Sequence, residues 1–309
     1  MFKSVILTAL AGVVAAPLIA SPALAAGTTT GNLAGAVRDT RGAIVADADI
    51  TILVPESPNV AAQAHTDAAG RFKVTGLDEG AYNIQIDRDG WTEWAPGRTD
   101  SPTAYAIRAG RTTVANSVVY AAGRVTGKVT TATGAPAAGV QVSAEDDEHA
   151  RSFDGTTATD GTYSLRVAPN ETYVLRFTDG HFTQFAPSTA GRDEATRYAV
   201  GAGRTVRVSN KLLAAATLTG TLTDVAGAPV AGAQVNYIDM NAGSVSATTD
   251  AAGHYTIDKL APGDFKVYFL TSQGQLQWAY QALGYDEAET FTLPLGGTAT
   301  VDDQLLPIS

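Results

Sequence analysis

The chain has 309 residues, no cysteine, and 31 acidic against 21 basic side chains, a formal net charge of −10. This balance argues against nucleic acid or an anionic membrane surface as the main partner, because both require a basic surface. Without cysteine the chain forms neither disulfides nor zinc–thiolate sites and has no thiol nucleophile.

The first 25 residues have the features of a secretory signal peptide. Lys3 gives a positive start, residues 5–20 are apolar, and Ala23-Leu24-Ala25 supplies the small residues that signal peptidase recognises. A membrane anchor is the alternative, but the apolar run is short and Pro17 interrupts it. We expect cleavage after Ala25 and a secreted, extracellular mature chain without a membrane span, soluble or loosely held at the cell surface by its contacts.

Three segments of the mature chain share one pattern. They open as LAGAVRDTRGAIVADADITI from Leu33, VTGKVTTATGAPAAGVQVSA from Val125 and LTGTLTDVAGAPVAGAQVNY from Leu218. Internal repetition of this kind indicates tandem units. It predicts module 1 at residues 26–122, module 2 at 123–214 and module 3 at 215–309, after the signal peptide at 1–25. No stretch is left for a separate catalytic domain.

Apolar and polar residues alternate within each module. In module 1, Tyr82, Ile84 and Ile86 alternate with Asn83, Gln85 and Asp87. A period of two is typical of antiparallel strands with one buried face. Turn residues recur every eight to twelve positions, which favours a sandwich of about seven strands. The joints at residues 120–123 and 213–216 are short, so we expect the modules to abut in a semi-rigid rod, roughly 100 Å long from strand dimensions.

These motifs resemble the carboxypeptidase regulatory-like domain. The resemblance is carried by GTLTDVAGAPVAGAQV, by TTDAAGHYTIDKLAPGDFKVYF and by a closing Gly-x-Thr strand, and it covers essentially the whole mature chain in three copies. It implies an all-β chain of three tandem seven-stranded antiparallel β-sandwiches, similar to transthyretin (prealbumin) and to immunoglobulin domains. Related sandwiches, among them starch-binding modules and collagen-adhesin repeats, are non-catalytic, and bind glycans or proteins or act as spacers.

Motifs that carry chemistry are missing from the sequence. There is no HExxH, no GxSxG and no Walker A loop, and the four histidines stand beside turns or in an acidic run. The run Glu145-Asp146-Asp147-Glu148 is rich in oxygen ligands but lacks the spacing of an EF-hand, and a solvated loop is the simpler interpretation. We therefore expect no enzyme activity, no cofactor and no metal site.

Aromatic residues recur after the same strand in every module. The candidate ligand-binding residues are Trp91, Trp94, Phe182, Phe185, Trp278 and Tyr280. Flat aromatic faces stack on sugar rings, which makes these residues candidates for a glycan-binding surface. Alternatively, Trp94, Phe185 and Trp278 are residues of the core or the lip of each sandwich, which recur because the fold recurs. Trp91 has polar neighbours, so we expect it to be the better exposed of them.

Three functional hypotheses remain. The first is a secreted, non-catalytic multi-module protein that binds a polysaccharide or a cell-surface glycan. The alternative is an extracellular structural or adhesive rod that contacts surface proteins. A minor alternative is an accessory protein of an amylase-like glycoside hydrolase. All three rest on analogy with proteins of the same fold.

Overall fold

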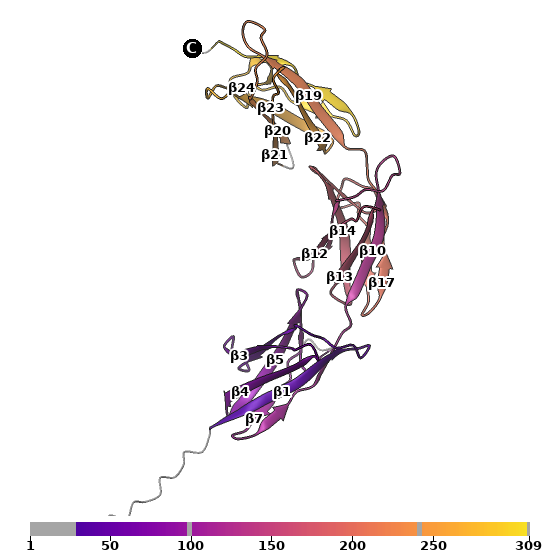
Figure 1. Ribbon diagram of the computed structural model, residues 1–309, viewed down its shortest axis with the longest axis vertical. Coiled ribbons are helices and arrows are strands. Elements are labelled where there is room, and N and C mark those ends of the chain that lie inside the picture. Colours follow the sequence, from indigo (N-terminus) through magenta and orange to yellow (C-terminus); the bar gives the residue numbers. More distant parts are fainter. Residues whose placement is uncertain (1–28, 98–100, 240–242, 308–309) are drawn as a thin grey trace, which may run out of the picture.

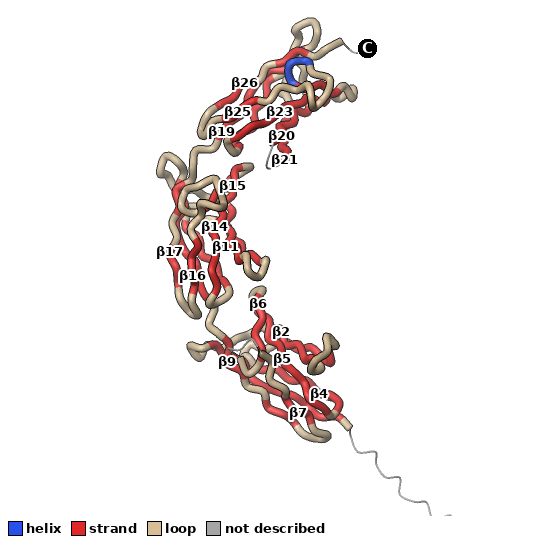
Figure 2. The backbone as a smooth tube through the Cα atoms, turned by 180° about the vertical axis from the view of Figure 1, so that it is seen from behind, coloured by secondary structure: helices blue, strands red, loops and turns tan. Residues whose placement is uncertain are grey.

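The computed structural model describes residues 29–97, 101–239 and 243–307, in which three β-rich modules follow one another along a curved rod (Figure 1). The predicted signal peptide lies outside the described residues. The same curve is seen from behind in Figure 2, where strands account for most of each module and loops for the connections between them.

The strands repeat in the same order in each module. Module 1 contains β1 (Thr30–Asp39), β2 (Asp49–Leu53), β3 (Val60–His65), β4 (Arg71–Asp78), β5 (Gly80–Arg88), β6 (Trp91–Trp94), β7 (Tyr105–Ile107), β8 (Thr112–Val114) and β9 (Ser117–Val119). Module 2 contains β10 (Gly123–Thr130), β11 (Gln141–Asp146), β12 (Arg151–Thr156), β13 (Thr162–Val167), β14 (Glu171–Asp179), β15 (Phe182–Phe185), β16 (Arg197–Val200), β17 (Thr205–Arg207) and β18 (Asn210–Lys211).

Module 3 adds a short helical turn to this order. It contains β19 (Ala216–Thr223), β20 (Gln234–Asp239), β21 (Gly243–Thr248), β22 (His254–Leu260), β23 (Gly263–Leu270), β24 (Leu276–Trp278), the 3-10 turn η1 (Ala279–Gln281), β25 (Phe291–Leu293), β26 (Thr298–Thr300) and β27 (Asp303–Gln304).

Each module is a sandwich of two sheets. In module 1 one sheet has the order β4-β1-β8 with β9 also paired to β1, and the other has the order β3-β2-β5-β6 with β7 also paired to β5. The strands β6 and β7 pair with opposite ends of β5, and β8 and β9 follow each other along β1. Counted as two interrupted strands, these segments give seven strands, and the predicted all-β sandwich is confirmed. The pairing is antiparallel except that β8 and β9 run parallel to β1.

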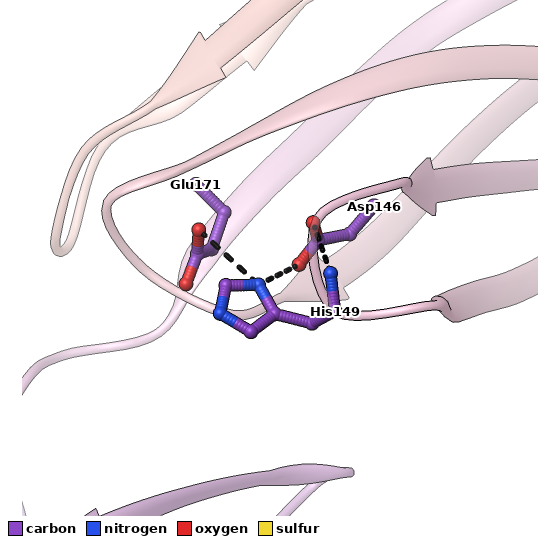
Figure 3. Close-up of side chains that lie close together, drawn as sticks. All are labelled: Asp146, His149 and Glu171. Atoms are coloured by element: carbon purple, nitrogen blue, oxygen red, sulfur yellow. Dashed lines mark hydrogen bonds and ion pairs between the residues drawn. The ribbon is translucent and has the colours of Figure 1, made fainter.

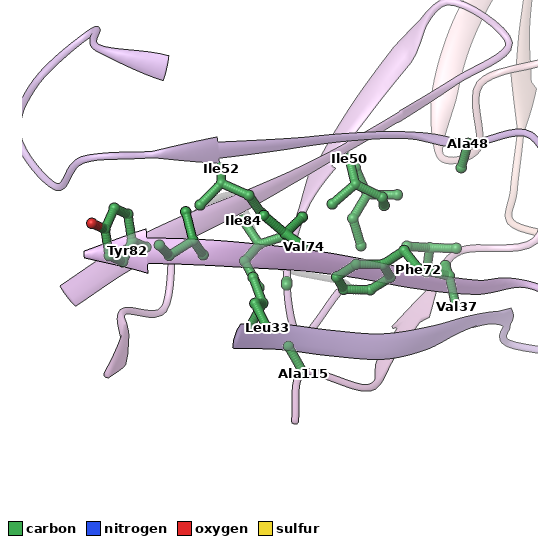
Figure 4. Close-up of a cluster of buried hydrophobic side chains, with 14 of the residues drawn as sticks. Leu33, Val37, Ala48, Ile50, Ile52, Phe72, Val74, Tyr82, Ile84 and Ala115 are labelled. Carbon is green, nitrogen blue, oxygen red and sulfur yellow. The ribbon is translucent and has the colours of Figure 1, made fainter. Parts of the chain in front are cut away.

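The core of each module lies between its two sheets. In Figure 4, Leu33, Ile50, Ile52, Phe72 and Ile84 of module 1 meet from both layers, and each is at most 4% exposed. The alternation that predicted strands also sets this burial, because Ile84 and Ile86 are buried while Gln85 and Asp87, which alternate with them, are partly exposed. Modules 2 and 3 have cores of their own, each made of residues from that module alone.

One repeated glycine lets the last strand approach the first. A Cβ on Gly127 would lie 1.8 Å from the Val208 carbonyl oxygen and 2.8 Å from the Tyr163 ring, and Gly35 and Gly220 are equally confined in modules 1 and 3. The Tyr163 hydroxyl donates a hydrogen bond of 2.6 Å to the same Val208 carbonyl. Only glycine fits where the first strand, the last strand and this ring meet.

The substitution Gly127→Ala should destabilise module 2 by about 1–3 kcal/mol, the usual cost of an extra methyl group in a filled site. The added Cβ meets backbone, which cannot rotate away. Differential scanning calorimetry measures the effect. Gly191→Ala is the control, because its Cβ would lie 3.5 Å from the flexible Glu194 side chain. Equal stability of the two variants would contradict the packing argument.

Candidate functional site

The structure corrects the expectation that Trp91 is exposed. Its side chain is 4% exposed, and its ring packs edge-on against Phe153 of module 2, with ring centroids 6.1 Å apart. Trp91 pairs with Arg88 on β5, so it lies on the side of the sheet that also holds Ile84 and Ile86. The next module completes its burial, and no pattern within module 1 reveals that.

The other predicted aromatics lie in different surroundings in the three modules. Phe182 is 1% and Phe185 8% exposed, and the Arg192 guanidinium lies 5.6 Å from the Phe185 ring centre. Trp94 and Trp278 are half-buried, whereas Tyr280 is 51% exposed. The six residues therefore do not form one aromatic surface. A role of any of them in ligand binding stays a prediction.

Tyr280 lines a shallow groove of about 450 Å³ on module 3. The other lining residues are polar: Thr221, Thr223, Gln281, Asp302, Asp303 and Gln304. Tyr280 and Gln281 have φ angles of 60° and 65°, a left-handed conformation that non-glycine residues rarely adopt. The Tyr280 N–H donates to Asp303 Oδ2 at 3.0 Å, which helps to hold this backbone. In modules 1 and 2 the position after the repeated Trp94-Ala and Phe185-Ala is a proline, so the groove's aromatic wall belongs to module 3.

A cluster of side chains on module 2 has the composition of a metal site. Figure 3 shows the His149 ring between Asp146 and Glu171, with Nδ1 3.0 Å from Asp146 Oδ2 and 3.7 Å from Glu171 Oε2. The Arg151 guanidinium already bridges the two acids, because its Nε donates to Asp146 at 2.8 Å and a terminal nitrogen donates to Glu171 at 3.0 Å. Asp146, His149, Arg151 and Glu171 therefore form an ion-pair network in which the two acids are shared by His149 and Arg151.

The acidic run of module 2 is correspondingly different from the solvated loop expected from the sequence. Asp146 is 2% exposed, Glu145 forms ion pairs with Arg176 and Arg192, and Asp147 forms ion pairs with Arg192 and Arg197. Burial acts to raise the pKa of Asp146, but hydrogen bonds from Arg151 and His149 outweigh it and hold that pKa below its usual value. The depressed pKa means that ionised Asp146 stabilises the folded module.

We expect Asp146→Asn to lower the free energy of unfolding of module 2 by about 1–3 kcal/mol at pH 7, because charge-assisted hydrogen bonds are lost. A carboxyl group whose pKa is lower in the folded state stabilises that state fully at a pH above its unfolded pKa of about 3.9. This stabilisation is lost as the pH falls through the pKa of the folded state. The difference between the variant and the natural chain should therefore shrink towards pH 2. Urea unfolding at the two pH values measures it.

Asp193→Asn, which changes an exposed acid of the same module, is the control and should leave stability nearly unchanged. A difference for Asp146→Asn that is the same at pH 7 and pH 2 would show that Asp146 acts through shape and not through its charge.

The two module junctions are built from the same hairpin turn. At the first junction, the turn between β5 and β6 reaches module 2: Asp89 forms an ion pair of 3.0 Å with Arg166, and Trp91 packs on Phe153. At the second junction, the turn between β14 and β15 reaches module 3. There Asp179 pairs with Lys259 at 2.6 Å, and the His181 N–H donates to the Lys259 carbonyl at 3.1 Å.

The first joint is itself bonded to both modules. The Tyr120 N–H donates to the Glu93 carboxylate at 2.9 Å, and the Ala121 N–H donates to Thr40 Oγ1 at 3.0 Å, both within module 1. The Ala121 carbonyl then accepts from the Gly203 N–H of module 2 at 2.8 Å. The short connection and the hairpin contact together restrict how the two modules can move, since loose tethers lack such bonds.

The chain belongs to the carboxypeptidase regulatory-like domain family, whose model matches three times, at residues 32–119, 124–212 and 217–306. No curated protein matches the chain. No helix in the described part of the chain is long and apolar enough to cross a membrane.

Solved structures with similarity to the chain include two bacterial pilins. The Bacillus anthracis TIE protein is 12% identical, with 90% of this chain and 50% of that chain covered and a TM-score of 0.27. BcpA, the major pilin subunit of Bacillus cereus, is 10% identical, with 89% and 99% covered and a TM-score of 0.26. A streptococcal ancillary pilin is 12% identical, with 88% and 98% covered and a TM-score of 0.32. At such scores, no conclusion about this chain rests on these similarities.

Proposed function

We propose that the chain is an extracellular, non-catalytic rod that holds its three modules in a fixed order and spacing and contacts other molecules through their surfaces. The observation that carries this proposal is the repeated junction, in which a hairpin turn of one module bonds to the next through an acid–base pair. An array that serves only as a string of independent modules has no need of such contacts.

Further support for the proposal comes from the extent of the repeats and from the N-terminal sequence. Family matches run from residue 32 to residue 306, so nearly all of these residues belong to the three repeated domains. The apolar N-terminal segment with Ala23-Leu24-Ala25 supports export. In this proposal the partners are surface proteins or glycans, and the chain catalyses no reaction.

The stiffness of the first junction can be measured by double electron–electron resonance, which gives the distribution of distances between two spin labels. Because the chain has no cysteine, Lys73→Cys in module 1 and Asp193→Cys in module 2 provide unique labelling sites. We expect one narrow distance distribution for the natural junction. Combining Asp89→Ala with Phe153→Ala should widen it roughly twofold, because the ion pair and the apolar contact with Trp91 are both removed.

Phe291→Ala is the matched control, since Phe291 is also a half-buried phenylalanine but packs inside module 3. Circular dichroism checks that each variant remains folded. A broad distribution already present in the natural chain would refute the rod.

A second candidate function, binding of a neutral saccharide, is favoured by the groove beside Tyr280. The groove combines an exposed phenol ring with hydroxyl, amide and carboxylate groups, and such sites bind the apolar faces and hydroxyl groups of sugars. The strained backbone at residues 280 and 281 is the type of feature that gathers at ligand sites. Asp302 and Asp303 with no lysine or arginine in the lining disfavour acidic saccharides.

We expect residues 26–309 to bind at least one of maltohexaose, cellohexaose, xylohexaose and chitohexaose in isothermal titration calorimetry. Tyr280→Ala should weaken this binding about fivefold to tenfold, because the stacking surface is lost. Tyr285→Ala is the control, since Tyr285 is 44% exposed on the same module but does not line the groove. Absence of binding, or equal loss in both variants, would refute the groove as a saccharide site without affecting the rod.

A further inference from the structure

The first junction encloses a cavity whose lining is strongly basic. The cavity has a volume of about 240 Å³ and lies between the two modules. Five arginines line it: Arg41 and Arg88 from module 1, and Arg124, Arg166 and Arg204 from module 2. One acid, Asp39, is also in the lining. In a chain with a net charge of −10, five of the 21 basic residues meet in this one place.

Arg88 is the buried member of the group. It is 6% exposed, its guanidinium lies 5.0 Å from the Trp91 ring centre, and it donates to the Tyr120 carbonyl. Its Nε has no hydrogen-bond partner among the described residues. A buried, charged donor without a partner is costly, and such a group in a native structure usually indicates a missing water, ion or ligand.

The acids near the cavity do not balance the arginines. Arg166 pairs with Asp89, Arg88 lies 3.5 Å from Glu93, and Arg41 lies 3.7 Å from Asp39. Counting these three acids against five guanidinium groups leaves a local charge of +2. The Arg204 guanidinium forms no ion pair with the described residues. Arginines that converge without matching acids repel one another, and an anion between them removes that cost.

The second junction provides a comparison within the same chain. A cavity of about 180 Å³ beside the second joint is lined by module 2 and the joint, with Thr133, Asp179 and Leu213 among its lining residues, and none of them is an arginine. Thr133 and Asp179 are the repeat counterparts of Arg41 and Arg88. No residue beyond Ala215 lines this second cavity, so an arginine-lined cavity that spans two modules is found at the first junction and is not repeated beside the second joint.

We propose that the cavity at the first junction binds a tetrahedral oxyanion, the phosphate or sulfate group of a free ion or of a larger molecule. Guanidinium groups recognise such groups through paired, charge-assisted hydrogen bonds. The volume corresponds to roughly eight water molecules, which accommodates one oxyanion with part of its hydration shell. Because the arginines come from both modules, a bound anion also fastens module 1 to module 2.

This site is independent of the saccharide groove on module 3 and of whether the rod is stiff without a ligand. The test is isothermal titration calorimetry of residues 26–309 with sodium phosphate, sulfate and pyrophosphate, at constant ionic strength adjusted with sodium chloride. We expect saturable binding that the double variant Arg124→Gln, Arg204→Gln weakens at least about tenfold, since both arginines are exposed at the cavity and neither forms an ion pair with an acid in the described part of the chain.

Arg207→Gln is the control, because Arg207 is an exposed arginine of β17 outside the cavity lining, and its loss removes one of the two positive charges that the double variant removes. It should leave binding unchanged. A comparison of dextran sulfate with neutral dextran distinguishes a free anion from an anionic group on a polymer. Binding of the inorganic ions indicates a free anion. Binding of dextran sulfate alone indicates a group carried on a polymer. No saturable binding of any of these anions, or equal weakening by Arg207→Gln, would overturn the proposal.

Discussion

The architecture depends on one contact, the hairpin turn that each of the first two modules places against its successor. At the first junction Asp89 bonds to Arg166, and at the second Asp179 bonds to Lys259. Exposed ion pairs contribute at most about 1 kcal/mol each, so the pairs alone do not fix the rod. They act together with a short, hydrogen-bonded joint and, at the first junction, with the ring contact between Trp91 and Phe153.

The fold is the constant part of the three modules, and their surfaces are the variable part. Every module keeps the glycine on its first strand and an alternating core. On that frame module 2 carries the ion-pair network around Asp146, and module 3 carries the groove beside Tyr280. Five arginines line the cavity at the first junction, and none lines the cavity beside the second joint. Such variation on a repeated frame is where differences in function are expected.

Much of the fold follows from local sequence, whereas the sites do not. The alternation of buried and exposed residues around Ile84 predicts strands, and the repeated motif around Gly127 predicts three modules. Both signals lie within short segments of the sequence, because strand periodicity and the close approach of two strands at a glycine are local properties. The expectation that Trp91 is exposed is wrong because its ring packs against Phe153, which lies more than sixty positions away in another module. The five arginines are far apart in sequence and meet only when the modules are assembled. Asp146 pairs with the nearby Arg151, whereas its neighbours Glu145 and Asp147 pair with Arg176, Arg192 and Arg197, which lie much further along the chain.

The most direct test of the rod is the measurement of residual dipolar couplings on partially aligned residues 26–309. Amide couplings report the orientation of each module separately, so the modules can be compared without any added label. The account predicts that a single alignment tensor fits the couplings of all three modules in their observed arrangement. Three tensors that differ in magnitude would show modules that reorient independently, and this result would contradict the rod.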